Sequence, residues 1–512
     1  MILENNIITI DELKCKVSQL CNENSSLSNE NIVLKEQLDW FRRQIFGQKS
    51  EKVIADVNEE QLLLEGFEKL KKEEVDALSV GNYKRKKNKR KGQDAIQIPE
   101  NLPVETTIID IPEDEKFCRE TGKPLVKIGE EVSHKLAHKP GSFYIKEIIR
   151  PKYVFPKGSE EGIRCADLPD AILSRCRADE SLLAEIFVKK FADHSPLYRT
   201  GEIFGRDGIR ISRQLLSQWV VKVGLALEPL YMAMKKSVLE NPYLYIDESS
   251  VSLLKPGKGK VQKAYMWVLV GGLSADPPYR VYNFREDRKH CHAKNLLKDY
   301  KGVFHSDKYA AYEELSSKEG LTWCPCWAHV RRKFFEAEAG DVDLREWILR
   351  KIRYLFMLER IAWSRSQEER LRIRQEKEVP IIDELIEKIK EKLENGSLLP
   401  KSNFSKALNY CYGLSPYLKN YTCHANARMD NNVAERAIRP LAIGRKNWLF
   451  VGSKNGGRAA ATILSLVQTC RNLGINPRTY LEDVMRRIMG HNSQRLHELL
   501  PDQWSAKQSS ND

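Results

Sequence analysis

Three carboxylates stand where a metal site can form. Asp247 follows the apolar run 243–246, Asp307 follows the run 302–306, and Glu435 lies in a segment with helical character. Two acids at strand ends and a third on a helix can converge to bind the hard divalent cations used in phosphoryl transfer. A single carboxylate is most often only a surface group. Together they predict a catalytic metal site for in-line displacement at a phosphodiester, with two Mg²⁺ or Mn²⁺ ions.

Local geometry refines this site. Neighbouring residues of a strand point to opposite faces, so Asp247 and Glu248 cannot share a site, and we expect the strand to end at Asp247. Asp430 or Asn431 can cap the helix that carries Glu435, and we expect that helix to end before Pro440.

A second cluster contains Cys324, Cys326 and His329. Cys-x-Cys-x-x-His can ligate zinc, but no fourth ligand lies nearby in the sequence. We therefore favour a buried strand end followed by a basic helix, and we predict no zinc.

Basic residues are abundant and clustered. The formal net charge is +13 and the sequence pI is about 9.0, which favours a polyanionic partner, DNA or RNA. Seven of the eight residues 84–91 are basic, as expected of a solvated linker that contacts phosphates or merely solvates the chain. The residues that we expect to contact DNA are Lys84, Arg85, Lys86, Lys87, Lys89, Arg90, Lys91, Arg213, Arg331, Arg332, Lys333, Arg439, Arg445 and Lys446.

Two aromatic residues, Trp448 and Phe450, are interleaved with basic residues just after Glu435. Aromatic and basic side chains together can hold a distorted nucleic-acid strand near the metal ions. The alternative is that both rings belong to the core.

The elements around the acids predict a mixed α/β sheet. Residues 243–335 give three strands, a helix, a strand, a helix and a strand. The strand candidates are 243–246, 265–270, 280–284, 303–305 and 321–324, and the helices are 290–299 and 308–317. Residues 336–425 are mostly helical and charged, as in an insertion.

The N-terminal half contains three further patterns. Leucines or Phe recur every seventh residue within 11–46, which predicts a parallel coiled-coil dimer rather than a single amphipathic helix. Short β-like runs occupy 99–165. Two helices around Gly208, the second capped by Ser212, suggest a helix-turn-helix, although a purely structural helical pair fits equally well.

The eleven cysteines are irregularly spaced, which favours reduced thiols and a cytoplasmic protein. No signal peptide is recognisable, and no uncharged apolar run reaches the roughly 18 residues of a membrane span. We therefore expect no membrane partner.

Four stretches together are recognisable, and they lie far apart in the chain. The sequence resembles the large transposase of the insertion-sequence sixty-six family, a bacterial DDE transposase, along nearly its whole length. The stretches are DNNVAERAIRPLAIGRKNW (430–448), KFADHSPLYR (190–199), SDKYAAY (306–312) and CWAHVRRKF (326–334).

The resemblance implies a ribonuclease-H-like core with the DDE triad at Asp247, Asp307 and Glu435. It also implies recognition of terminal inverted repeats, target DNA, an association with the bacterial nucleoid, and small accessory proteins of the same element. One departure concerns a Cys-rich zinc module of the relatives, of which only Cys118 remains, so we predict that this module folds without zinc.

We expect an α/β protein whose ribonuclease-H-like mixed-sheet core carries a helical insertion. The expected domains are a coiled coil (1–55), a basic linker (56–98), a degenerate zinc-finger-like β module (99–165), a helix-turn-helix-like region (166–238), the core (239–335 and 426–475), the insertion (336–425) and a helical tail (476–512). The function expected is Mg²⁺-dependent strand cleavage and transfer by a homodimer or higher assembly. The alternatives are an inactive DNA-binding relative and a nuclease without strand transfer.

Overall fold

The computed structural model describes residues 102–504 and Lys16, except for gaps at 114–115, 118–123, 125, 140, 155–162, 256–259, 273–278, 338–339 and 396–397. The chain divides into two compact units, residues 1–95 with 397–402 and residues 96–396 with 403–512. The predicted coiled coil, apart from Lys16, and the basic run 84–91 lie outside the described residues, so they remain predictions. Everything below concerns the second unit.

The centre of this unit is a five-stranded sheet with the order β7-β6-β5-β8-β9. Strands β5, β6 and β7 are antiparallel neighbours, whereas β8 and β9 run parallel to β5. The predicted mixed α/β sheet is confirmed, with its strands and helices in the predicted order. Their bounds are β5 Tyr243–Leu254, β6 Val261–Gly271, β7 Val281–Arg285, α6 His290–Leu296, β8 Gly302–Ser306, α7 Ala310–Ser316 and β9 Leu321–Pro325.

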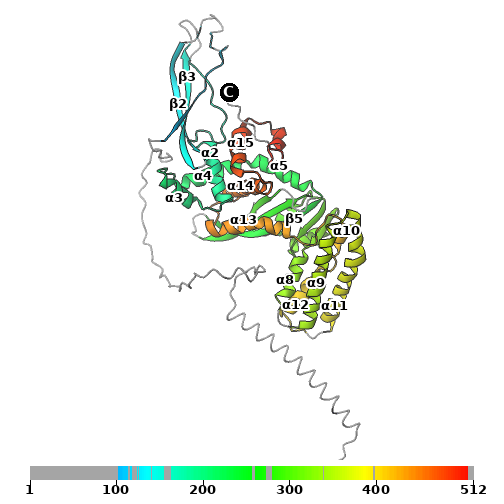
Figure 1. Ribbon diagram of the computed structural model, residues 1–512. Helices are drawn as coiled ribbons and strands as arrows, with labels where there is room; N and C mark the ends of the chain where they lie inside the picture. The colour runs from blue at the N-terminus through cyan, green and yellow to red at the C-terminus, as the bar shows by residue number, and fades with distance from the viewer. Residues whose placement is uncertain are drawn as a thin grey trace, which may run out of the picture. The chain divides into compact units, whose positions relative to one another are not determined.

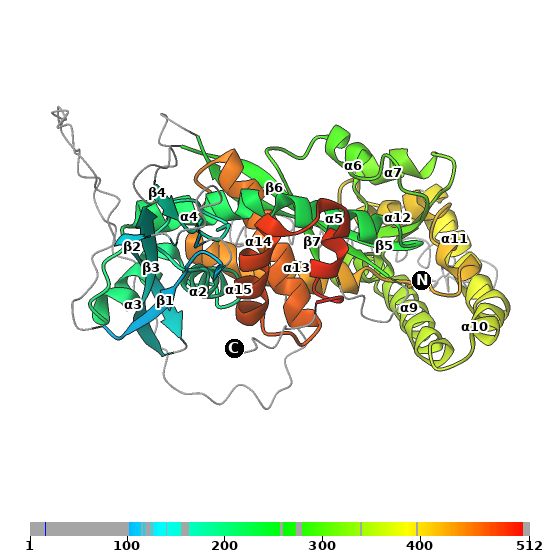
Figure 2. The ribbon, with the colours of Figure 1, turned by 90° about the horizontal axis from the view of Figure 1, so that it is seen from above.

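Helices cover both faces of the sheet and one edge (Figures 1 and 2). The side chain of Asn283 on β7 donates a 2.9 Å hydrogen bond to Tyr231 of α5 (Glu228–Leu239). Its neighbour Tyr282 points the other way and donates to a carbonyl of α13 (Asn432–Trp448). The backbone N–H of Tyr282 donates to Ser465 of α14 (Lys454–Asn472), so α14 covers the edge strand, where an unpaired backbone would invite aggregation.

Helix α13 does not end before Pro440, and that prediction is wrong. The helix continues through this proline to Trp448. A proline inside a helix removes one hydrogen bond and costs about 3 kcal/mol. The buried residues Ala437 and Leu441 lie on either side of it, so packing of this face on the sheet outweighs the loss.

Residues 336–425 are mostly helical, as predicted, and Figure 1 shows helices α8–α12 gathered together. Helix α11 buries Ile382, Leu385 and Ile389, whose spacing places them on one face of the helix. The bounds are α8 Trp327–Phe335, α9 Val342–Ala362, α10 Gln367–Ile373, the π-helical turn η3 Arg374–Glu378, α11 Val379–Glu394, α12 Asn403–Leu414 and the 3₁₀ turn η4 Asn420–Cys423.

The predicted helical pair is present as α3 (Leu197–Arg206) and α4 (Arg213–Ala226), and both follow α2 (Glu180–Phe191). Ser212 caps α4 as predicted, because its hydroxyl accepts the backbone N–H of Leu215 at 3.2 Å. Helix α4 packs tightly on α14, since a Cβ at Gly224 would lie 2.5 Å from that of Ala459. The buried face of α4 is therefore structural, and a DNA-reading role for this pair stays a prediction.

The predicted β module is a sheet in which β3 is paired by β1, β2 and β4. Its strands are β1 Val104–Ile108, β2 Val126–Lys139, β3 Ser142–Val154 and β4 Ile163–Cys165. Cys118 lies outside the described residues, so the zinc-free module remains a prediction. The C-terminal segment forms α15 (Pro477–Arg487) and the 3₁₀ turns η5 (Ile488–Gly490) and η6 (Ser493–Leu499). Within the described residues no helix combines the length and the apolar character of a membrane span.

Candidate active site

Two of the three acids meet where strand β8 stops. Tyr245 of β5 pairs with His305 of β8, and Asp247 and Asp307 each lie two residues further along. In parallel strands this places both acids side by side on one face. Strand β5 does not end at Asp247, as the sequence had suggested, but continues to Leu254 because β6 still pairs with it. The open edge at Asp247 comes from the end of β8.

The third acid covers the same face. Asp247 pairs with Val268 of β6, which in turn pairs with Tyr282 of β7, whose hydroxyl reaches α13. Directly paired residues share a face of a sheet, so Asp247 faces the helix that carries Glu435. Glu248 pairs instead with Trp267 and lies on the other face, as predicted.

The start of α13 is attached to β5 beside Asp247. The carboxylate of Asp430 accepts the backbone N–H of Asn432 at 3.1 Å, so Asp430 is the residue that caps the helix. The side chain of Asn431 instead donates to the carbonyl of Ile246 at 2.7 Å. This bond fixes the first turn of α13 at β5, and Glu435 follows one turn later.

The segment that leads into α13 is held by the ends of β8 and β9. The ring of His305 lies 2.8 Å from the carbonyl of Arg428 and accepts the N–H of the same residue at 3.1 Å. The backbone N–H of Trp327 donates to the carbonyl of Met429 at 3.0 Å. These contacts fix the segment before Glu435 to the end of β8, where Asp307 follows.

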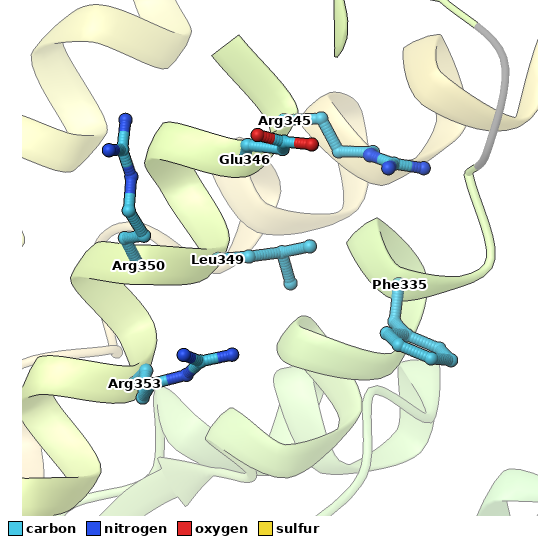
Figure 3. Close-up of a pocket in the computed structure, with 6 residues that line it drawn as sticks. All are labelled: Phe335, Arg345, Glu346, Leu349, Arg350 and Arg353. Carbon is cyan, nitrogen blue, oxygen red and sulfur yellow. The ribbon is translucent and has the colours of Figure 1, made fainter. Parts of the chain in front are cut away.

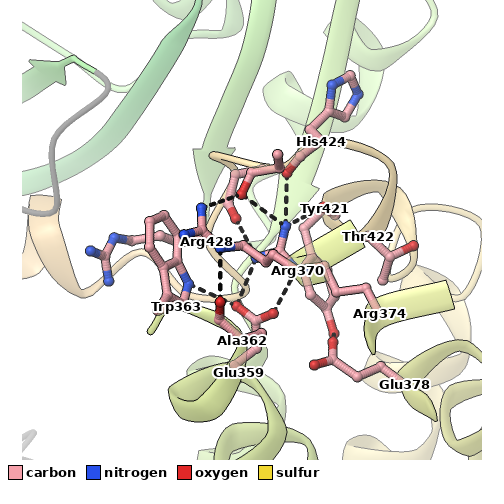
Figure 4. A network of polar contacts seen from close by, with 12 residues as sticks. Glu359, Ala362, Trp363, Arg370, Arg374, Glu378, Tyr421, Thr422, His424 and Arg428 are labelled. Carbon is pink, nitrogen blue, oxygen red and sulfur yellow. Dashed lines mark hydrogen bonds and ion pairs between the residues drawn. The ribbon is translucent and has the colours of Figure 1, made fainter. Parts of the chain in front are cut away.

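The insertion holds the same segment from the other side through the Arg374 cluster, formed by Glu359, Arg374, Glu378 and Tyr421 (Figure 4). Arg374 is fully buried, and its guanidinium donates to both carboxylate oxygens of Glu359, at 2.6 and 2.8 Å. It also donates to the carbonyls of Tyr421 and Ala427, at 3.1 and 2.8 Å. The insertion thus helps to position Glu435.

The three acids Asp247, Asp307 and Glu435, here called the carboxylate triad, all have raised pKa values. Burial, reinforced by Glu248 and by the other two acids, raises the pKa of Asp247 well above its usual range. Burial and the charge of Glu248 raise the pKa of Asp307 to about 7, and burial also raises the pKa of Glu435. Among the described residues, neither Asp247 nor Asp307 forms an ion pair. Such a cluster is suited to a bound cation.

Sequence reasoning missed the environment of Glu248. Its carboxylate accepts the Nε–H of Arg288 at 2.8 Å and the hydroxyl of Tyr312 at 3.0 Å. The guanidinium of Arg288 also stacks on Tyr309, 4.2 Å from the ring centre. No local sequence pattern links these residues. Glu248 thus forms an ion pair with Arg288 on the opposite face of the sheet, while its charge still acts on Asp247 and Asp307.

The Cys-His cluster adjoins the triad. Imidazole Nδ1 of His329 lies 3.6 Å from Oε1 of Glu435, and Nη2 of Arg332 lies 3.9 Å from its Oε2. The donor atoms of Cys326, His329 and Glu435 all lie within 4.8 Å of one another. Burial lowers the pKa of His329 to about 4 and raises that of Cys326 to about 12. Cys324 does not belong to this group, and Glu435, which is distant in the sequence, is its third potential donor.

The predicted DNA contacts fall into four groups. Those in 84–91 lie outside the described residues. Arg445 is engaged within the protein, since it donates to the hydroxyl of Ser249 at 2.8 Å and to the carbonyl of Ser250 at 2.6 Å. Arg331 is half-buried, and the exposed ones are Arg213, Arg332, Lys333, Arg439 and Lys446.

The two aromatic residues at the end of α13, Trp448 and Phe450, differ in their exposure to solvent. Phe450 is 47% exposed, so it is not a core residue. Trp448 is half-buried, with its ring centre 6.4 Å from that of Phe191 and the ammonium of Lys190 4.8 Å above it. Of these two rings, the ring of Phe450 is therefore the one that is free to stack on a nucleic-acid strand.

A basic hollow of about 410 Å³ lies where α8 ends and α9 begins (Figure 3). Arg345, Arg350 and Arg353 line it together with Phe335. Arg331, Arg332 and Lys333 of α8 come just before Phe335 in the chain, and Arg332 also lies beside Glu435. Basic side chains thus occur both beside the triad and beyond the end of α8.

Comparison with known proteins defines first the class and then the family. The mixed sheet, its acids and the basic residues belong to a DNA-processing enzyme of the transposase class, because residues 175–459 match the model described as "Transposase IS66 family". Residues 465–501 match "IS66 C-terminal element", and residues 33–107 match "Transposase C of IS166 homeodomain". The chain belongs to the IS66 transposase family. Membership implies transposase function, DNA as a partner and the use of a divalent metal that is general among DDE transposases.

Relatives of similar length occur in Sinorhizobium fredii (strain NBRC 101917 / NGR234). Uncharacterized protein y4qI is 32% identical over 504 residues, which cover 94% of this chain and 90% of the relative. Uncharacterized protein y4hP is 30% identical, with 92% and 89% covered. Uncharacterized protein y4jD is 29% identical, with 96% and 98% covered. The similarity therefore extends over nearly the whole chain.

Proposed function

We propose that this protein is an active DDE transposase that binds the terminal inverted repeats of its element and catalyses metal-dependent strand cleavage and strand transfer. The observation that supports the proposal is that Asp247 and Asp307 follow paired residues of β5 and β8, while α13, which carries Glu435, packs on the face of the sheet to which Asp247 belongs. The sheet order, with three antiparallel strands followed by two parallel ones, supports a ribonuclease-H-like core.

The donor chemistry of the triad fits two Mg²⁺ or Mn²⁺ ions. Carboxylate oxygens are the ligands that these hard cations prefer. Burial raises the pKa values of all three acids, and nearby carboxylates, Glu248 first, add to the shifts of Asp247 and Asp307, so a divalent cation would relieve this repulsion. When bound, the ions supply an activated nucleophile and charge stabilisation at the phosphodiester. The protein's own part is to hold three oxygen donors in fixed positions through β5, β8 and α13.

The basic side chains around the triad support a path for DNA. The exposed guanidinium of Arg332 lies beside Glu435, and Arg345, Arg350 and Arg353 line a separate hollow together with Glu346. Such groups bind phosphates without reading sequence. Phe450 provides an exposed ring for stacking on a displaced base. The run 84–91 would add non-specific affinity, and residues 11–46 would pair two chains.

The test uses the DNA that flanks this gene, with a marker in place of the coding region. The protein is supplied in trans in Mg²⁺-replete cells, and new marker junctions are sequenced for wild type, Asp247→Ala and the matched control Glu248→Gln. Glu248 is the next residue of β5 but lies on the opposite face, so its variant should still form junctions. Junctions from wild type and control, but not from Asp247→Ala, are expected.

Two other outcomes identify the alternatives. No junctions from any chain, even with the accessory proteins supplied, would favour an inactive relative that only binds DNA. Nicked element ends without joined products would favour a nuclease without strand transfer. Equal junctions from wild type and Asp247→Ala would refute the assigned triad.

A further inference from the structure

Three donors of different chemistry meet beside the triad. The ligand atoms of Cys326, His329 and Glu435 lie within 4.8 Å of one another. Cys326 precedes the first residue of α8, and His329 follows three residues later, so one helical turn brings the thiol and the imidazole together. Glu435 reaches them from α13, so the cluster exists only in the folded chain.

Two atoms of this cluster lack partners. Nδ1 of His329 and Oε1 of Glu435 are both buried, and neither has a hydrogen-bond partner among the described residues. They face each other at 3.6 Å, which is too long for a hydrogen bond. Buried polar atoms without partners are unusual, and a bound ion or water commonly satisfies them. A cation between them would satisfy both.

We propose that Cys326, His329 and Glu435 bind a thiophilic divalent cation of the Zn²⁺ type, and that this ion withdraws Glu435 from the Mg²⁺ site. The second half of the proposal rests on the proposed transposase function. A sulfur, a nitrogen and an oxygen suit zinc, whereas Mg²⁺ selects oxygen ligands only. Three protein ligands leave a fourth position for water. On binding, the thiol of Cys326 releases its proton to solvent.

Two contacts fit this inhibitory role. The backbone N–H of Asn431 donates to the sulfur of Cys326 at 3.2 Å, a bond that strengthens when the sulfur is a thiolate. The carboxylate of Glu435 presents Oε1 to His329 and Oε2 to Arg332. A cation bound to Oε1 engages the carboxylate of Glu435, which is then less available to an ion held by Asp247 and Asp307. The affinity of the triad for Mg²⁺ therefore falls.

The first experiment tests the site alone, with Co²⁺ as the probe and the full chain without DNA. Wild type should bind one more Co²⁺ per chain than Cys326→Ser, with thiolate charge-transfer and tetrahedral absorption bands. The matched control is Cys324→Ser, because that thiol is also buried but does not belong to the cluster. Other thiols of the chain contribute to all variants and cancel in the difference.

His329→Asn provides a second variant in case the serine substitution disturbs folding, which circular dichroism would reveal. It should lose the same bands. Difference spectra that are equal for wild type, Cys326→Ser and His329→Asn would refute the cation site. Loss of the bands in Cys324→Ser alone would assign the cation to a different thiol and would refute it as well.

The second experiment measures strand cleavage in Mg²⁺ while Zn²⁺ is added. Zn²⁺ should inhibit wild type and Cys324→Ser, added Mg²⁺ should relieve the inhibition, and Cys326→Ser should need about tenfold more Zn²⁺ or more. Equal inhibition of all three chains would refute competition for Glu435. Absence of cleavage without Zn²⁺ would count against the transposase, and the cobalt spectra would still decide the cation site.

Discussion

The carboxylate triad and the Arg374 cluster both bury acids, but they satisfy them differently. In the cluster, Glu359 receives two charge-assisted hydrogen bonds from Arg374, and Glu378 accepts the hydroxyl of Tyr421 at 2.7 Å. In the triad, Asp247 and Asp307 have no ion pair among the described residues. Both regions contain an acid whose pKa is raised by burial first, to about 8 for Glu378 and to about 7 for Asp307.

The difference separates a structural role from a functional one. A raised pKa alone does not identify an active site, because the pKa of Glu378 is raised as well and this residue lies inside the insertion. Among the described residues, the distinguishing property is that Arg374 pairs directly with Glu359, whereas no cation forms an ion pair with Asp247 or Asp307. Buried charge that the protein neutralises itself holds elements together, whereas buried charge that it leaves uncompensated awaits a ligand.

The largest expected effect is that of Asp307→Asn. Strand cleavage should fall roughly 10³-fold or more, because one metal ligand is lost. The stability of the metal-free protein should rise. The folded-state pKa of Asp307 lies above its usual value of 3.8, so the wild type loses stability as pH rises from about 4 to 7, and the variant does not.

The gain in unfolding free energy at pH 8 should be at most about 4 kcal/mol, and it should vanish near pH 3.5. Urea unfolding at the two pH values, with EDTA present, measures it. A variant that is less stable than wild type at pH 8 would show that the triad is a structural cluster after all.

Arg374→Met should have the next largest effect, a loss of about 3–5 kcal/mol of stability, because it leaves the buried Glu359 carboxylate without its cation, although the indole N–H of Trp363 still donates to it. Activity should fall with it, since the segment leading to Glu435 loses its anchor. Arg372→Met, an exposed neighbour, should change stability by less than about 0.5 kcal/mol. Equal stability of the two variants in chemical denaturation would contradict the role given to the cluster.

Glu378→Gln sharpens the comparison, because it removes a buried acid from the cluster without touching the triad. The pKa of Glu378 is raised to about 8, so the wild type loses stability as pH rises from about 4.5 to 8. The variant should therefore be more stable at pH 8 by about 1–3 kcal/mol, with no difference at pH 4. Its cleavage rate should stay within about twofold of wild type. A large loss of activity in Glu378→Gln would contradict the purely structural role given to the Arg374 cluster.

The smallest effect concerns the surface. Lys446→Ala should lower the salt dependence of DNA binding by about 0.9 in the slope of log K against log salt, as expected for one phosphate contact. Arg445→Ala, its neighbour, should leave the slope unchanged and reduce stability instead, because Arg445 bonds to Ser249 and Ser250. Equal slopes in fluorescence-anisotropy titrations of wild type and Lys446→Ala would show that Lys446 does not contact DNA phosphates.

Local chemistry made much of this protein predictable. The alternation of strands and helices in 243–335 follows from short apolar runs between polar segments, and the cap at Ser212 follows from one side chain. Family membership was predictable because long stretches such as 430–448 are distinctive. The opposite orientations of Asp247 and Glu248 needed only the alternation of a strand.

Tertiary structure alone decided the rest. Strand β5 continues past Asp247 because β6 pairs with it, and α13 continues through Pro440 because its buried face packs on the sheet. Both errors came from local rules that long-range packing overrode. The joining of Glu435 to Cys326 and His329, and the hold of Arg374 on the segment before α13, link residues far apart in the chain. Spacing within a sequence carries no information about such contacts, because only the assembled sheet and insertion bring those side chains together.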